Sequence, residues 1–360
     1  MNFNILTLGC KVNQYESQAM REDMLNHGYT LSDDKDKADI TIVNSCTVTS
    51  VSDAKNRKLI NKIRRANPDG IIILTGCMPQ AFPEETANFK NCDIVLGNAK
   101  RAVLIPTLEN YLKNKHILVQ ISEHNGKNEV YENLHITSFG EHTRAFIKIE
   151  DGCNRFCSYC IIPYARGRVR SKSLTDLKTE VQRVAAGGYK EVVLVGINLS
   201  AYGLDEDYNL ADAVECACSV DGIVRVRLGS IEPERMDEDM VRRLAAQPKF
   251  CPQFHLSLQS GCDKTLKAMN RHYDTYEYAE IVARLRRTFD NSSITTDVMV
   301  GFAGEDDYDF EQSMQFVKSI GFAKVHVFPY SRRKGTVADK ADDQVSPEIK
   351  EHRAKLMGNL

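Results

Sequence analysis

The run D-G-C-N-R-F-C-S-Y-C, residues 151–160, is the most informative stretch of this 360-residue chain. Its C-x-x-x-C-x-x-C spacing lets the thiolates of Cys153, Cys157 and Cys160 converge from one loop on three corners of a cubane iron–sulfur cluster. Such clusters usually take four thiolates, so three local ones leave one iron open, as a catalytic metal site requires. The run therefore predicts a catalytic 4Fe–4S cluster.

Two simpler interpretations of this loop stay open: a zinc knuckle, and three ordinary buried cysteines. Zinc sites normally show paired C-x-x-C units or nearby histidines, and the loop has neither. The iron–sulfur interpretation is therefore favoured.

Around the loop, short apolar runs alternate with amphipathic stretches, which is typical of parallel β-α-β units. The loop directly follows the first predicted strand of this series, residues 144–149. The later strands are expected at residues 191–195, 223–228, 254–258, 293–300 and 324–328. The intervening helices are expected near residues 173–186, 237–246, 276–289 and 308–320. Six parallel strands with crossovers fit an open, partial (β/α)6 barrel, in which catalytic groups gather at the carboxyl ends of the strands.

The first third of the chain shows the same alternation and predicts a doubly wound parallel sheet. Strands are expected at residues 3–8, 39–44, 71–75 and 93–96, and helices at residues 14–27 and 53–66. Three of these strands are followed by a cysteine: Cys10, Cys46 and Cys77. Because the carboxyl ends of parallel strands share one edge, we expect these three cysteines to meet and to hold a second cluster.

The sequence thus predicts an α/β protein with an N-terminal doubly wound parallel sheet followed by a partial (β/α)6 barrel. We expect an N-terminal domain over residues 1–118, a polar linker over 119–140, a barrel domain over 141–345 and a C-terminal helix over 346–360.

Composition narrows the class of protein further. The charge is balanced, with 47 Lys and Arg against 49 Asp and Glu, so a nucleic-acid surface would have to be a local patch. We expect a cytoplasmic protein without a membrane span or signal peptide. Eleven cysteines then indicate metal or redox chemistry rather than disulfides. Five of them are expected to be small buried hydrophobes: Cys92, Cys216, Cys218, Cys251 and Cys262.

The cysteine loop resembles that of the radical S-adenosylmethionine (SAM) enzymes, with Tyr159 at their usual aromatic position. More of the chain is similar to one branch, the methylthiotransferases that act on N6-threonylcarbamoyladenosine in tRNA. The motifs that carry this resemblance are T-L-G-C-K-V-N-Q-Y-E-S (7–17), V-N-S-C-T-V-T (43–49), L-T-G-C (74–77), C-I-I-P-Y-A-R-G (160–167), L-S-L-Q-S-G-C (256–262) and F-P-Y-S-R-R-K-G-T (328–336).

The resemblance implies two 4Fe–4S clusters and SAM as cofactors, in a transferase that modifies tRNA. The cluster ligands would be Cys153, Cys157 and Cys160 in the barrel and Cys10, Cys46 and Cys77 in the N-terminal domain. The SAM pocket would be lined by Tyr159, Gly196, Asn198, Ser230, Glu232 and Gln259. The expected reaction adds a methylthio group to carbon 2 of N6-threonylcarbamoyladenosine, next to the anticodon.

Alternative interpretations come from sister branches that act on isopentenyladenosine in tRNA or on a ribosomal-protein aspartate. A plain electron-transfer iron–sulfur protein is a weaker alternative, because an electron carrier needs neither an open iron nor a barrel. The resemblance also implies a low-potential electron donor such as flavodoxin or ferredoxin, and we expect a monomer. The resemblance also implies a C-terminal RNA-binding β-barrel, and we expect no such domain within these 360 residues.

Basic residues gather in three places: residues 55–65, 166–172 and 332–334. The last two clusters follow the cysteine loop and the sixth strand of the barrel, so they are expected at its mouth. We therefore expect them, rather than the first cluster, to meet RNA phosphates.

Overall fold

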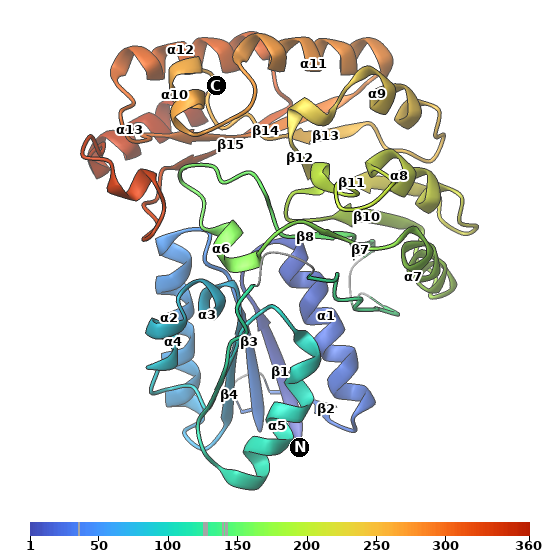
Figure 1. The fold of residues 1–360 in the computed structure, drawn as a ribbon, viewed down its shortest axis with the longest axis vertical. Helices are drawn as coiled ribbons and strands as arrows, with labels where there is room; N and C mark the ends of the chain where they lie inside the picture. The colour runs from blue at the N-terminus through green and yellow to red at the C-terminus, as the bar shows by residue number, and fades with distance from the viewer. Residues whose placement is uncertain (35–36, 125–128, 139, 141–142) are drawn as a thin grey trace.

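In a computed structural model, the chain is described over residues 1–34, 37–124, 129–138, 140 and 143–360. The N-terminal unit is a six-stranded parallel sheet in the order β2-β1-β3-β4-β5-β6 (Figure 1). The strands are β1 (Asn2–Thr7), β2 (Thr30–Leu31), β3 (Ile40–Ser45), β4 (Ile71–Gly76), β5 (Ile94–Leu96) and β6 (Leu118–Gln120). The helices are α1 (Lys11–Asn26), α2 (Ser50–Ala66), α3 (Cys77–Ala81), α4 (Pro83–Ala87) and α5 (Leu104–Asn114).

This sheet is buried on both faces, which is why its strands are continuous apolar runs. Ile71 and Ile73 point to the face that α1 and α5 cover, whereas Ile72 and Leu74 pack against α2 on the other face. The predicted doubly wound sheet is therefore confirmed.

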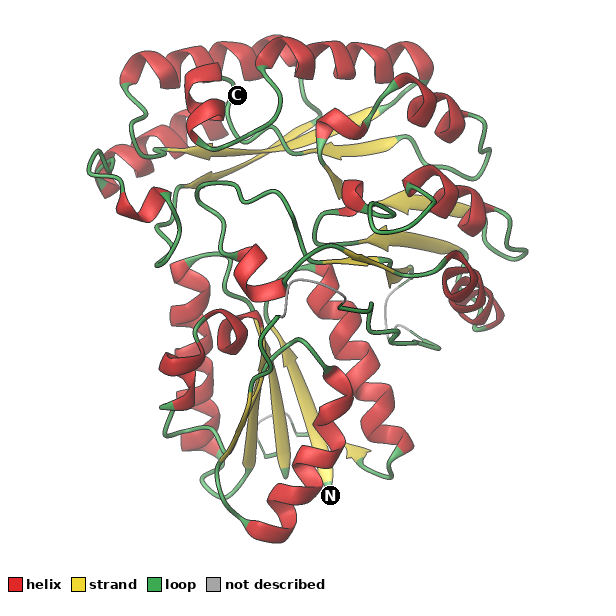
Figure 2. Ribbon diagram, in the orientation of Figure 1, coloured by secondary structure: helices red, strands yellow, loops and turns green. Residues whose placement is uncertain are grey.

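The second unit is an open, partial barrel of parallel strands with helices along its outer side (Figure 2). Its strands are β7 (Ala145–Lys148), β10 (Glu191–Val195), β11 (Arg225–Leu228), β12 (Ser230–Ile231), β13 (Gln253–Leu256), β14 (Ser293–Val300) and β15 (Lys324–Pro329). Its helices are α7 (Leu174–Ala186), α8 (Leu210–Cys218), α9 (Glu238–Ala245), α10 (Asp263–Ala268), α11 (Thr275–Thr288), α12 (Asp307–Ile320) and α13 (Pro347–Gly358). The third predicted strand corresponds to β11, and Gly229 separates it from the short strand β12, which was not predicted; the strands form two ladders, β7-β10-β11 and β12-β13-β14-β15.

The predicted cluster loop is an excursion from the first barrel strand. It leaves after β8 (Glu150–Asp151), passes through α6 (Ile162–Arg166) and returns as β9 (Arg170–Ser171), which pairs antiparallel with β8. Gly152 adopts φ +87°, and a Cβ there would lie 1.9 Å from the carbonyl oxygen of Arg168, so only glycine fits this crossing. In Figure 1, α6 lies at the junction between the barrel and the end of the N-terminal sheet.

The predicted partial barrel is confirmed, and its strands begin and end within about two residues of the expected positions. The first helix starts earlier than predicted, at Lys11, because its N-cap is Cys10, which makes no side-chain capping bond and gives no capping signal. The predicted domain boundaries stay predictions, and residues 125–128, 139 and 141–142 near the linker lie outside the described part of the chain. None of the helices in the described part is long and apolar enough to cross a membrane.

Candidate functional site

The three N-terminal cysteines lie at the carboxyl ends of three adjacent strands. Cys10 follows β1, Cys46 follows β3, and Cys77 follows β4 and opens α3. The loops are in close contact: a Cβ at Gly9 would lie 2.9 Å from the Cβ of Cys46, and φ at Gly9 is +121°. Each of the thiols of Cys10 and Cys46 also lies close enough to Cys77 for their charges to interact. The structure thus brings together the three cysteines that the sequence predicts at this edge.

The second triad is held within the excursion from the barrel. The amide of Cys153 donates to the carbonyl of Gly167 at 3.0 Å, and the amide of Cys160 donates to the carbonyl of Cys157 at 2.9 Å. The charge on Cys160 would interact with both Cys157 and Cys153. All three residues are partly exposed, unlike the residues of the core.

Burial raises the pKa of Cys46 and Cys153 to about 11 and that of Cys160 to about 12. These thiols are therefore protonated at neutral pH. A metal that binds them must displace the protons, because the ligand is the thiolate. Within the described residues, no three His, Cys, Asp or Glu side chains are close enough to ligate a single ion.

Side-chain hydrogen-bond donors contact sulfurs in both triads. Arg271 donates to Cys157 Sγ at 3.3 Å, and Asn198 Nδ2 lies 3.6 Å from Cys153 Sγ. At the other triad, Arg166 Nε donates to Cys77 Sγ at 3.2 Å, and Asn98 Nδ2 lies 3.8 Å from the same sulfur. Such donors stabilise negative charge on cysteine sulfur and set the reduction potential of a cluster. Sequence reasoning missed Arg271 and Asn98, because no local pattern links either residue to a cysteine.

The residues predicted to bind SAM lie at the carboxyl ends of successive barrel strands. Gly196 and Asn198 follow β10, and Ser230 and Glu232 lie in and after β12. Gln259 follows β13 with φ +67°, and its carbonyl accepts from the amide of Met299 at 2.8 Å.

Within the described part of the chain, two buried oxygens beside Cys153 have no hydrogen-bond partner: Oδ1 of Asn198 and Oε1 of Glu150. The other carboxylate oxygen of Glu150 accepts a hydrogen bond from the backbone amide of Asn198 at 2.7 Å. Burial raises the pKa of Glu150 well above its usual value. A Cβ at Gly196 would lie 2.6 Å from this carboxylate, so glycine keeps the space open. Unpartnered polar atoms beside a partly exposed thiol fit a site for a polar ligand such as SAM.

Two predicted SAM contacts are already engaged with protein groups. Glu232 forms an ion pair with Arg271, so its carboxylate orients the guanidinium that donates a hydrogen bond to Cys157 Sγ. Tyr159 packs edge-on against Phe302, with 6.2 Å between ring centroids, and burial raises its pKa well above the usual value. Both residues therefore shape the wall around the cysteine loop.

In the basic cluster at residues 166–172, three of the four members are buried, so the prediction that these three meet RNA phosphates is wrong. Arg166 and Lys172 are fully buried and Arg170 is nearly so, and only Arg168 is exposed. Arg166 donates to Glu16 of α1 at 2.5 and 3.0 Å and to Asn13 at 2.9 Å. The cluster therefore joins the barrel to the N-terminal unit.

The ion-pair network around Glu16 extends further through the junction. Glu16 also pairs with Arg101 at 2.6 Å and with Lys148 at 2.9 Å. Lys148 in turn pairs with Asp151 at 2.6 Å, directly before the cysteine loop. Since these side chains are buried, the pairing offsets the cost of removing several charges from water.

The third basic cluster is partly buried as well, so the phosphate prediction is wrong for Arg333. This residue is 3% exposed and pairs with Asp53 of α2 at 2.7 Å. Conversely, the first cluster, on α2, is mostly exposed. The burial of a basic side chain depends on a partner distant in sequence, which composition alone does not reveal.

The remaining cysteines stand apart from both triads. Cys92, Cys218 and Cys262 are buried, as predicted, whereas Cys216 and Cys251 are partly exposed. The thiol of Cys262 faces α12, where Gln312 Oε1 lies at 3.3 Å.

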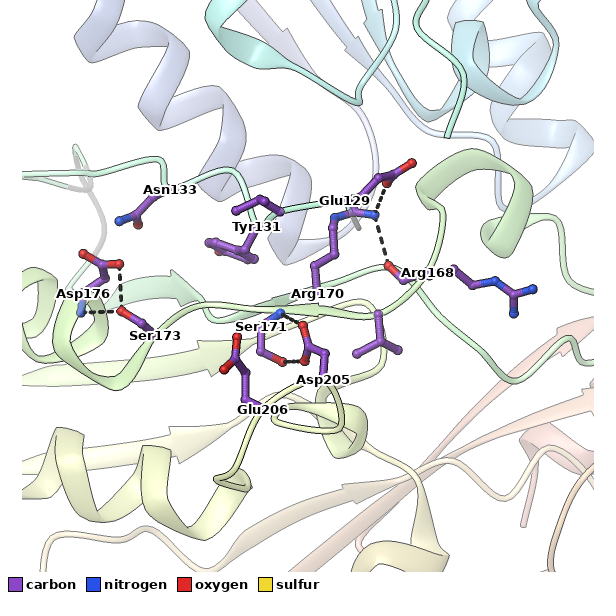
Figure 3. A pocket seen from close by; sticks show the side chains of 12 residues that line it. Glu129, Tyr131, Asn133, Arg168, Arg170, Ser171, Ser173, Asp176, Asp205 and Glu206 are labelled. Carbon is purple, nitrogen blue, oxygen red and sulfur yellow. Dashed lines mark hydrogen bonds and ion pairs between the residues drawn. The ribbon is translucent and has the colours of Figure 1, made fainter. Parts of the chain in front are cut away.

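A pocket of 530 Å³ lies between the segment around Glu129–Asn133, β9 and the loop carrying Asp205 and Glu206 (Figure 3). None of the predicted site residues lines it. Ser171 donates to Asp205 at 2.5 Å and Ser173 to Asp176 at 2.8 Å, so its polar groups are largely satisfied among themselves. In Figure 3 the side chain of Arg168 points away from the other labelled residues. The pocket is therefore separate from the cysteine site.

Comparisons with known proteins show which families share this architecture. The radical SAM superfamily model matches residues 147–317, and the model described as "Uncharacterized protein family UPF0004" matches residues 2–97. The fold is similar to that of the radical SAM methyltransferase TsrM from Kitasatospora setae, with a TM-score of 0.66 at 13% identity over 94% of this chain and 77% of that one. It is also similar to the cobalamin-dependent SAM radical enzyme OxsB, with a TM-score of 0.60 at 10% identity over 99% and 55%. Fold and cysteine loop together define a radical SAM enzyme.

Curated relatives identify the family. The threonylcarbamoyladenosine tRNA methylthiotransferase of Aquifex aeolicus is 38% identical over 98% of this chain and 86% of its own length. That of Thermotoga maritima is 40% identical over 98% and 80%. The tRNA-2-methylthio-N(6)-dimethylallyladenosine synthase of Clostridium botulinum is 34% identical over 98% and 79%. The chain belongs to the radical SAM methylthiotransferase family, in its threonylcarbamoyladenosine tRNA branch.

Proposed function

We propose that this chain transfers a methylthio group to carbon 2 of N6-threonylcarbamoyladenosine, next to the anticodon of tRNA. The observation that carries the proposal is the contact between the excursion that carries one cysteine triad and a cysteine of the other triad. Arg166, six residues after Cys160, contacts Cys77 of the other triad at 3.2 Å. An enzyme that both abstracts a hydrogen and delivers sulfur to the same carbon needs its two centres close together.

In this proposal, Cys153, Cys157 and Cys160 would hold one 4Fe–4S cluster with an open iron for SAM, and Cys10, Cys46 and Cys77 would hold the other. When bound, the clusters and SAM supply radical hydrogen abstraction, sulfur and a methyl group. Neither triad has a fourth cysteine in the loops that carry it. Each would therefore leave one iron open, which suits SAM binding at one site and sulfur delivery at the other.

The surrounding side chains would adjust and protect these centres. The buried cations Arg271 and Arg166 each donate to a cysteine sulfur, so they would stabilise the negative charge that ligation and reduction bring. The open oxygens of Asn198 and Glu150 would accept hydrogen bonds from the polar groups of SAM. Tyr159 and Phe302 would exclude water from that side of the loop.

The best-placed surface for the tRNA backbone is a basic stripe on α2, formed by Lys55, Lys58, Lys62 and Arg65. Their spacing of three or four residues sets them on one helical face, and all four are exposed. The helix starts at the domain junction, where the amide of Ser50 donates to Ser331 at 3.1 Å. A phosphate backbone leaving the site would therefore meet this stripe.

The remaining partners follow from the same proposal. A low-potential electron donor such as flavodoxin or ferredoxin would supply the reducing electron. The enzyme would work as a monomer in the cytoplasm, where tRNA is its substrate.

The test is complementation followed by mass spectrometry of tRNA nucleosides. A strain that lacks its threonylcarbamoyladenosine methylthiotransferase should regain 2-methylthio-N6-threonylcarbamoyladenosine with this chain, but not with its Cys153→Ala variant. If the wild-type chain instead restores methylthio-isopentenyladenosine in a strain lacking that activity, it belongs functionally to the sister branch.

A further inference from the structure

Three large side chains are exposed beside the cysteine loop, where most neighbours are buried. Phe156 is 37% exposed, Tyr164 is 52% exposed, and Arg168 is also exposed. The rings of Phe156 and Tyr164 meet edge-to-face, with centroids 6.2 Å apart. The guanidinium of Arg168 lies 4.7 Å from the centroid of the Phe156 ring. Together they form a compact aromatic and cationic surface, the Phe156 platform.

The backbone holds Phe156 in this exposed position at a conformational cost. Its φ is +49°, in the left-handed region that bulky residues rarely adopt. Asn270 Nδ2 donates to the carbonyl of Phe156 at 3.1 Å, and the amide of Ser158 donates to the carbonyl of Met269 at 3.1 Å. Strain of this kind persists where surrounding bonds fix it, and it is characteristic of functional sites.

The platform lies beside the contact between the barrel excursion and the N-terminal triad. Phe156 stands between Cys153 and Cys157 in sequence, whereas Tyr164 and Arg168 flank Arg166, which contacts Cys77. Figure 1 shows α6, which carries Tyr164, at the junction of the two units. A substrate reaching both triads would pass these side chains.

We propose that the Phe156 platform stacks an unpaired base of the RNA substrate; this rests on the proposed function. Exposed aromatic faces bind bases of single-stranded RNA by stacking, and a guanidinium adds cation–π attraction and a charge for the adjoining phosphate. Among the described residues, no carboxylate pairs with Arg168, so its charge is available for an anionic partner. This charge favours a nucleotide over a neutral apolar partner.

The test measures RNA binding to the cluster-loaded protein without oxygen, by fluorescence anisotropy. The probe is a labelled anticodon stem-loop RNA carrying N6-threonylcarbamoyladenosine. Phe156→Asn removes the ring but tolerates the left-handed backbone, so the cysteine loop keeps its shape. We expect its Kd to rise roughly tenfold, and that of Tyr164→Ala by a similar factor. Phe156→Tyr should stay within about twofold of wild type, because it retains the ring.

Two controls separate stacking from general effects. Tyr276→Ala removes a 73% exposed aromatic on α11 and should leave the Kd unchanged. A fully paired RNA duplex of equal length should bind wild type and Phe156→Asn alike, because its bases are not available for stacking. Wild-type affinity for the stem-loop in both Phe156→Asn and Tyr164→Ala would overturn the platform and leave the proposed function standing. Absence of stem-loop binding by the wild-type protein would overturn both.

Discussion

Replacing Arg166 with Met tests whether the buried network joins the two units. Arg166 is fully buried and donates to Glu16, Asn13 and Cys77. Removing one partner from a buried ionic network costs about 3–5 kcal/mol. Because Glu16 keeps Arg101 and Lys148, we expect the lower end, about 3 kcal/mol, or a fall in Tm of about 4 °C for a chain of 360 residues.

The assay is thermal and urea unfolding of the cluster-loaded protein without oxygen, followed by circular dichroism, since the chain has no tryptophan. Arg242→Met is the matched control: this arginine is 71% exposed and pairs only locally with Asp239, so its loss should cost within about 0.5 kcal/mol. Glu16→Gln combined with Arg166→Met should cost less than the sum of the two single changes. A loss below about 1 kcal/mol for Arg166→Met would refute the idea that this network stabilises the junction.

Three further predictions concern the pKa of Glu16, glycine positions with positive φ, and the salt dependence of tRNA binding. Burial alone would raise the pKa of Glu16, but Arg101, Arg166 and Lys148 lower it well below its usual value. The stabilising contribution of the Glu16 carboxylate is therefore present above about pH 4.5 and is lost as the pH falls. Urea unfolding between about pH 5 and 3 should then show a smaller decline in the free energy of unfolding for Glu16→Gln than for wild type. Gly76→Ala would place a Cβ 2.4 Å from the carbonyl oxygen of Ser45. At Gly28, φ is also positive, but no atom of the described residues beyond its two chain neighbours lies within 4 Å of such a Cβ, so Gly28→Ala should cost only roughly 1–2 kcal/mol and Gly76→Ala well over that. Equal losses of stability in the two variants would exclude the contact with Ser45 as the cause. Changing Lys55, Lys58 and Arg65 to Gln should reduce the slope of log Kd for tRNA against log salt concentration by about 2–3. As a control, Lys318→Gln on α12 should leave this slope unchanged. An unaltered slope in the triple variant would remove α2 from the RNA surface.

The fold was predictable because its signals are local. Buried parallel strands appear as short apolar runs, such as residues 71–75. The meeting of Cys10, Cys46 and Cys77 followed from one topological rule, that the carboxyl ends of parallel strands share an edge.

What sequence reasoning could not predict depends on partners distant in the chain. Arg166 resembled a phosphate ligand, but its main partner, Glu16, lies 150 residues away on α1. Arg271 likewise reaches Cys157 from 114 residues away. A charged residue near a strand end can face solvent or a buried counter-charge, and only the packing of the two units decides between them.

The most direct test of the central claim is a paired assay on the Cys10→Ala, Cys46→Ala, Cys77→Ala variant, with its other cluster shown to be intact. One product measured is 5′-deoxyadenosine, and the other is 2-methylthio-N6-threonylcarbamoyladenosine in tRNA. The account predicts that SAM cleavage to 5′-deoxyadenosine survives, because it depends on the barrel triad, while the modified nucleoside disappears. Persistence of the modified nucleoside would contradict the claim that the N-terminal triad delivers the sulfur.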